Sequence, residues 1–301
     1  MHVHGRDHAV PAKSRAFAIG IGLNLLFLFV EVVYGLRAHS LALLSDAGHN
    51  LGDVLGLGLS WGALVLGQRL PSARHTYGMR RASILASLGN AMLLLVTVGG
   101  ISWEAIQRLL HPQTVEGQTV MVVAAIGIAV NGLAALLFMS GKEHDINVRS
   151  AFQHMLSDAA VSLGVVVAGL AILYTGRSWL DSAVSLVVGG VIVLGTWSLL
   201  KESLRLALDA VPEDTDLPAI QRYLEQLPGV TTIHDLHVWA MSTTEAALTV
   251  HLVVPNRDFS DDAMAQVCRE LHLRFGIEHT TIQIERGDGA AECGQAPAHV
   301  V

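Results

Sequence analysis

Long apolar segments constrain the fold of this chain more than any other feature of its sequence. A bilayer core of roughly 30 Å is crossed by a helix of about 20 mostly apolar residues, and six segments meet that requirement. They lie at Ala16–Leu36, Leu41–Leu66, Ile84–Leu109, Thr119–Met139, Phe152–Tyr174 and Leu180–Leu199. Charged residues make up only 15% of the chain, against roughly 25% in soluble domains. We therefore expect an α-helical membrane protein with six transmembrane helices.

The overall charge argues against nucleic acid as a partner. The net charge is -7, whereas binding to phosphates requires a concentrated basic face. The two cysteines, Cys268 and Cys293, form no CxxC motif, so they predict neither a disulfide framework nor a cysteine zinc site.

A change in composition after the sixth segment predicts a second domain. The stretch "DAVPEDTDLP" reads as a linker, and the chain beyond it has the patterns of a helix, two strands, a helix and a final strand. This order predicts a small α+β layer with its helices on one face of the sheet. The expected divisions are an N-terminal segment with His2, His4 and His8, the six-helix domain, the α+β domain and a disordered tail, at residues 1–15, 16–208, 209–287 and 288–301.

The distribution of basic residues predicts the orientation in the membrane. One side carries Arg6, Lys13, Arg15, Arg69, Arg74, Arg80, Arg81, Lys142, Arg149, Lys201 and Arg205, and the other carries Arg37, Arg108 and Arg177. The positive-inside rule then places both termini and the α+β domain in the cytoplasm.

Two polar motifs recur inside the apolar segments. "HNLGD" places His49 and Asp53 four residues apart, and "HMLSD" repeats the spacing with His154 and Asp158. On a helix this spacing puts both side chains on one face. Two such helices facing each other would supply two imidazoles and two carboxylates, a donor set suited to Zn²⁺. The alternative is that each histidine only hydrogen-bonds its neighbouring aspartate as a structural contact.

Further features of these segments bear on the same site. Small residues recur every four positions at Gly48, Gly52, Gly56 and at Ala160, Gly164, Ala168, a pattern that lets membrane helices approach closely. Asp46 precedes His49 by three residues, and it either orients that imidazole or makes a structural contact. Other polar residues in the segments must also find partners inside the bundle: Asn24, Glu31, Asn50, Asn90, Glu104, Asn131 and Asp181.

Several motifs occur together and in order: "SLALLSDAGHNLGD", "HTYGMRRASILASLGNAMLLL", "FQHMLSDAAVSLGVVVAG", "WLDSAVSLVVGGVIV" and "VTTIHDLHVWAM". With them the chain resembles the cation diffusion facilitator family, in its bacterial zinc-efflux branch. The resemblance implies a homodimer of six-helix protomers in the bacterial inner membrane, with a copper-chaperone-like cytoplasmic domain. It also implies that divalent metal is exported in exchange for protons and that this export confers metal resistance. The implied transport site consists of His49, Asp53, His154 and Asp158.

The resemblance points to further candidate metal sites with weaker support. His75, in "SARHTYG", is similar in place to a loop metal site of some members, although a solvated loop histidine is the alternative. Strand alternation predicts that His234 and His237 face opposite sides. The resemblance implies that His251 and Glu285 join His237 in a regulatory zinc site, with His234 as a further candidate.

The expected function is Zn²⁺ efflux, with Cd²⁺ or Co²⁺ as the alternative preferred ion. Metal needs deprotonated ligands, so protons and metal compete for the same site. An enzyme, namely a metal-dependent intramembrane hydrolase, is the competing class. The sequence has no HExxH motif, and four filled positions would leave none for a catalytic water.

Overall fold

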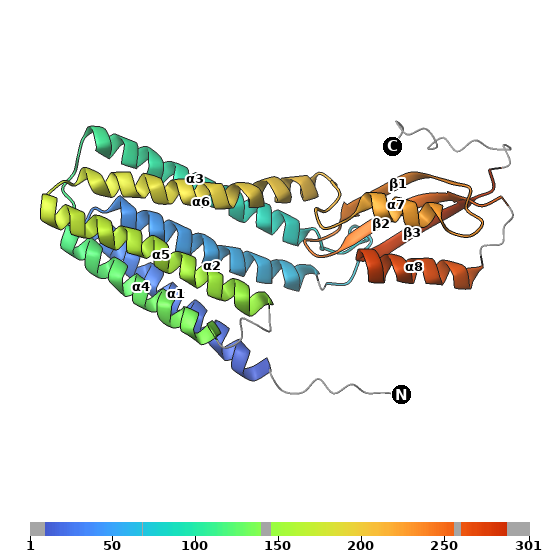
Figure 1. Ribbon diagram of the computed structural model, residues 1–301, viewed down its shortest axis with the longest axis horizontal. Helices are drawn as coiled ribbons and strands as arrows, with labels where there is room; N and C mark the ends of the chain where they lie inside the picture. The colour runs from blue at the N-terminus through green and yellow to red at the C-terminus, as the bar shows by residue number, and fades with distance from the viewer. Residues whose placement is uncertain (1–9, 68, 140–145, 256–259, 288–301) are drawn as a thin grey trace. The chain divides into compact units, whose positions relative to one another are not determined.

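The computed structural model describes residues 10–67, 69–139, 146–255 and 260–287 (Figure 1). The chain divides into two compact units, one comprising residues 1–58 and 90–198 and the other residues 59–89 and 199–301. The expected N-terminal segment, through residue 9, and the expected tail from residue 288 lie outside the described residues.

Six long helices occupy the first two thirds of the chain (Figure 1). They are α1 Val10–Arg37, α2 Leu41–Gly67, α3 Ala82–Leu110, α4 Gly117–Met139, α5 Ile146–Thr175 and α6 Trp179–Ala207. Each of the six predicted apolar segments lies within one of these helices. Among the described residues, α3, α4, α5 and α6 are long and apolar enough to cross a membrane.

Helices α4 and α5 pack very closely in the first unit. A methyl group at Gly169 of α5 would lie 2.7 Å from the backbone nitrogen of Met121 in α4. One at Gly117 of α4 would lie 2.8 Å from the carbonyl oxygen of Gly169. Backbone-to-backbone contact of this kind requires residues without side chains.

A carboxylate of α6 caps the start of α2. The first backbone N–H groups of a helix have no partner within it, and Asp181 accepts hydrogen bonds from the backbone nitrogens of Leu41, at 2.6 Å, and Ala42, at 3.4 Å. Ser40 donates to the same carboxylate, and the hydroxyls of Ser45 and Ser185 lie 2.6 Å apart one turn further on. These contacts bind α2 to α6 at the end where α2 begins.

The C-terminal domain has the predicted order of elements. They are α7 Leu217–Glu225, β1 Thr232–Ala240, β2 Ala246–Val253, α8 Asp261–Phe275 and β3 Ile277–Glu285. The sheet order is β1-β2-β3, with β1 antiparallel and β3 parallel to β2. Side-chain caps begin both helices, because the oxygens of Asp216 and Ser260 accept from backbone nitrogens three residues on.

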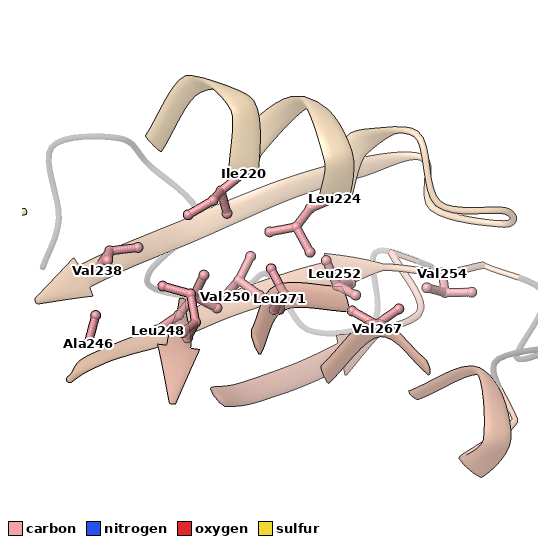
Figure 2. Close-up of a cluster of buried hydrophobic side chains, with 11 residues drawn as sticks. Ile220, Leu224, Val238, Ala246, Leu248, Val250, Leu252, Val254, Val267 and Leu271 are labelled. Carbon is pink, nitrogen blue, oxygen red and sulfur yellow. The ribbon is translucent and has the colours of Figure 1, made fainter. Parts of the chain in front are cut away.

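One face of this sheet is covered by both helices. Ile220 and Leu224 of α7 and Val267 and Leu271 of α8 pack into a single core with the alternate β2 residues Leu248, Val250 and Leu252 (Figure 2). The expected arrangement of helices on one face is therefore confirmed. Because side chains alternate along a strand, Thr249 and His251 of β2 face the opposite side.

Strand β1 contains a bulge that changes which side chains share a face. His234 pairs with His251 and His237 pairs with Thr249, so three steps on β1 oppose two on β2. Asp235, within the bulge, has a φ of 52°. Paired residues share a face, so the expectation that His234 and His237 lie on opposite faces is wrong. The extra residue of the bulge reverses the alternation that the prediction assumed.

Candidate metal centres

Three of the four predicted intramembrane ligands come together in the first unit. His49 and Asp53 lie one turn apart on α2, and His49 Nε2 is 3.8 Å from Asp53 Oδ2. Asp158 of α5 places Oδ1 3.3 Å from His49 Nε2. Side-chain ligand atoms of all three residues lie within 4.8 Å of one another.

These separations suit a tetrahedral ion. Zinc bonds to nitrogen and oxygen of about 2.0–2.2 Å place neighbouring ligand atoms roughly 3.3–3.5 Å apart. The His49–Asp158 and His49–Asp53 distances, 3.3 and 3.8 Å, require little adjustment to reach that geometry. The Asp158 side chain is 1% exposed, whereas Asp53 is 26% exposed, so the cluster is buried on the α5 side and more open at Asp53.

The fourth predicted ligand, His154, belongs to α5 one turn before Asp158. Its side chain lies outside the described residues. Its participation in the site therefore stays a prediction.

Asp46 is 1% exposed and makes its described hydrogen bond across helices. It accepts from Ser162 Oγ of α5 at 3.0 Å. This hydrogen bond ties α2 to α5 one turn from the cluster, and Asp46 also interacts electrostatically with His49.

The small residues suggested that α2 and α5 approach each other closely through their glycines. The structure instead directs the glycines of α2 towards α3. Methyl groups at Gly48, Gly52 and Gly56 would meet side chains of α3, namely Thr97 and Ile101, then Leu94, then Asn90. On α5, a methyl group at Gly164 would meet nothing within 4 Å. The small face of α2 therefore serves the α2–α3 packing, and the contacts between α2 and α5 include the polar pairs His49–Asp158 and Asp46–Ser162.

A second cluster lies on the helix-free face of the C-terminal sheet. His251 Nδ1 is 2.9 Å from Glu285 Oε1, and His234 Nε2 is 3.3 Å from both Glu285 Oε2 and His251 Nδ1. These ligand atoms also fall within 4.8 Å of one another. The histidine grouped with His251 and Glu285 is thus His234, where the sequence had suggested His237.

Asp235 connects His237 to this cluster. One carboxylate oxygen lies 2.9 Å from His237 Nε2, and the other lies 3.5 Å from His251 Nε2. His251 therefore directs Nδ1 into the cluster and Nε2 towards a carboxylate, the arrangement that fixes the ring orientation of metal-binding histidines. The sequence pattern missed Asp235 because alternation along a regular strand would turn it away.

Other predicted ligands stay apart from the two clusters. His75 is exposed in a turn, where its backbone nitrogen donates to Ser72, and it belongs to neither group. His2, His4 and His8 lie outside the described residues.

Two protein-family models match the chain. The cation efflux transmembrane domain matches residues 17–206, and the cytoplasmic domain of cation efflux proteins matches residues 212–287.

Curated relatives resemble the chain over nearly its whole length. The metal cation efflux system protein CzcD of Cupriavidus metallidurans is 36% identical over 98% of this chain and 92% of its own length. The zinc transporter ZitB of Escherichia coli is 36% identical over 94% and 91%. The cadmium, cobalt and zinc/H(+)-K(+) antiporter of Bacillus subtilis is 32% identical over 93% and 92%.

Proposed function

Because the chain belongs to the cation diffusion facilitator family of cation efflux proteins, we propose that it exports Zn²⁺ from the bacterial cytoplasm in exchange for protons. Members of this family are membrane transporters and not enzymes. The relatives are named for zinc, cadmium and cobalt, and the choice of zinc as main substrate is part of the proposal.

The observation that carries the proposal is the convergence of His49, Asp53 and Asp158 from two helices. A borderline-soft dication matches a set of imidazole and carboxylate donors. Its two positive charges offset two carboxylates that would otherwise be costly at bilayer depth. His154, one turn from Asp158, completes the proposed set of four.

Proton exchange follows from the chemistry of these ligands. Each must be deprotonated to hold metal, so metal and protons compete for the same electron pairs. In the inward-facing state the site accepts zinc from the cytoplasm. After the helices rearrange, protons from the more acidic outer side displace the ion and are carried inward.

The cluster of His234, His251 and Glu285 is proposed as a regulatory zinc site. Its ligand separations of 2.9 and 3.3 Å resemble those of the transport cluster. Metal bound there would tighten a homodimer through the cytoplasmic domains and favour export when cytoplasmic zinc is in excess. Both termini are proposed to lie in the cytoplasm, in accordance with the basic loops.

The proposal is tested by transport into vesicles. Purified protein is reconstituted, and zinc flux under an imposed pH gradient is compared for wild type, His49→Ala and Asp158→Ala. Both variants are expected to lose flux while His272→Ala, a half-exposed histidine on α8, retains it. Undiminished flux in both site variants would exclude this site as the route.

A further inference from the structure

Glu31 is a buried carboxyl group that the proposed transport site does not use. It lies in α1 and is 0% exposed. An ionisable side chain inside a membrane helix is costly and is usually retained for a function. None of the metal ligands proposed above belongs to α1.

The contacts of Glu31 lead to the helix that carries His49. Asn50 Nδ2 donates a hydrogen bond to Glu31 Oε2 at 2.8 Å, and Asn50 follows His49 directly in α2. The second side-chain partner of Glu31 is Asp46, also on α2, with which it shares a hydrogen bond. Glu31 thus contacts one amide donor and one other carboxyl group.

Asp46 is an acidic neighbour of Glu31, and the two side chains interact. Asp46 Oδ2 also accepts a hydrogen bond from Ser162 Oγ. Adjacent carboxyl groups away from water do not readily both ionise, because like charges repel strongly there. The two protons of such a pair therefore leave in separate steps that belong to the pair as a whole.

The charged groups around Glu31 supply no permanent counter-charge. Helix α2 presents Asp46 and the titratable His49, and α5 presents Asp158. Helix α4 has no ionisable residue. On α1 itself, the described cation Arg37 lies over the ring of Tyr34, and no lysine or arginine among the described residues forms an ion pair with Glu31.

We propose that Glu31 is a proton-binding site separate from the metal ligands, and that it loads and unloads in opposition to metal at the His49 cluster. This inference rests on the proposed proton exchange and names a carrier for it. When zinc occupies the cluster, its charge stabilises the Glu31 carboxylate, so the O–H bond breaks and the proton leaves to the aqueous side then open. When zinc departs, a proton from the other side re-forms the bond.

The hydrogen bond from Asn50 gives this coupling a structural path. Metal binding fixes His49, and Asn50 moves with it because the two residues are consecutive in one helix. Any shift of α2 that accompanies metal binding therefore also changes the hydrogen bond that stabilises ionised Glu31. The charge of the bound ion and the position of Asn50 then both stabilise the ionised form of Glu31.

The test separates proton coupling from metal passage. Full-length wild type, Glu31→Gln, Glu31→Asp and the control Glu104→Gln are reconstituted in vesicles. Glutamine keeps the shape of protonated glutamate but cannot release a proton. Glu104 supplies the same substitution in another long helix, where it pairs with Arg108. One assay measures zinc accumulation and proton movement under a pH gradient, and the other measures exchange of labelled for unlabelled zinc at equal pH.

Glu31→Gln is expected to keep zinc exchange within about twofold of wild type and to lose gradient-driven accumulation by about tenfold, within the range of coupling between sites. Fewer protons should move per zinc ion, Glu31→Asp should restore part of the coupling, and Glu104→Gln should behave as wild type. Unchanged accumulation and proton movement in Glu31→Gln would overturn the inference. An equal loss of zinc exchange and accumulation in Glu31→Gln would also overturn it, because that result indicates a structural role. An equal loss of accumulation in Glu104→Gln would overturn it as well. Zinc transport by wild type without proton movement would instead refute the proton exchange itself.

Discussion

At the scale of single residues, the two clusters differ in how their histidines are held. His49 faces two carboxylates, Asp53 and Asp158, and each belongs to the proposed ligand set. His251 has one nitrogen towards its cluster and the other towards Asp235. We therefore expect His49 to influence which ion the transport site prefers, and the orientation of His251 to depend on Asp235.

Replacing His49 by aspartate should change the ion preference of transport. A third carboxylate among the ligands favours harder ions, so Mn²⁺ should gain relative to Zn²⁺. Competition between the two ions for uptake into vesicles measures the change. His272→Asp, at a half-exposed position of α8, is the control and should leave the preference unaltered. An unaltered preference in His49→Asp would show that His49 does not tune the site.

Replacing Asp235 by asparagine should weaken zinc binding at the cytoplasmic cluster. Asparagine tolerates the left-handed backbone at this position, so the bulge is kept while the carboxylate that orients His251 is lost. Loss of such a partner typically costs about 10–100-fold in metal affinity. Zinc titration in an Asp158→Ala background, which weakens the transport site, measures the effect.

The control for that experiment is Asp262→Asn, in the exposed first turn of α8. It removes one negative charge from the same domain and should leave the affinity unchanged. Equal zinc affinities for Asp158→Ala with and without the Asp235→Asn substitution would contradict the role assigned to Asp235.

At the scale of elements, glycine positions decide which helices approach one another. On α5, Gly169 touches the backbone of α4, whereas a methyl group at Gly164 would meet nothing within 4 Å. The same residue type on one helix thus has a packing role at one position and none at another. The contacts between α2 and α5 include the polar pairs Asp46–Ser162 and His49–Asp158.

Gly169→Ala should therefore destabilise the helical domain while Gly164→Ala should not. At Gly169 the added methyl group meets backbone atoms that cannot turn aside, and overpacking of this kind costs about 1–3 kcal/mol. At Gly164 the substitution adds only helix propensity, up to about 1 kcal/mol of stabilisation. Thermal unfolding of the two variants in detergent compares them. Equal melting temperatures would contradict the close α4–α5 contact.

At the scale of the whole molecule, the C-terminal domain has a hydrophobic core of its own, and a further buried cluster joins Ala240 of β1 to Ile84 of α3 and Leu206 of α6. The core of the C-terminal domain draws its buried members only from residues between Ile220 and Ile277. The buried groups of the helical domain are drawn from the long helices, as in the cluster around Phe27 and Val165. A domain with its own core is expected to fold by itself.

Residues 209–287, produced alone, should therefore melt cooperatively and be stabilised by zinc. A ligand present at about one hundred times its dissociation constant adds about 2.7 kcal/mol to the stability of the folded state. Melting curves with and without zinc, for the fragment and its His234→Gln variant, measure both effects. The variant should melt cooperatively with a smaller zinc shift. A fragment without a cooperative transition would show that the domain needs the helices.

The sequence by itself determined the long helices, the strands and three residues of the proposed transport cluster, His49, Asp53 and Asp158. Membrane spans follow from the length of apolar segments, and the i, i+4 spacing alone places His49 and Asp53 on one helix face. Its resemblance to one family also covered nearly the whole chain, from about Ala16 to Glu285, and the family models confirm the family.

The tertiary structure decided what local periodicity does not encode. A bulge in β1 brought His234 in place of His237 beside His251 and Glu285. The glycines of α2 turned towards α3, and Glu31 came to lie against Asn50 and beside Asp46. The physical reason is the same in each case. Periodicity fixes the face of an element on which a side chain lies, but only the packing of one element against another fixes what that face meets.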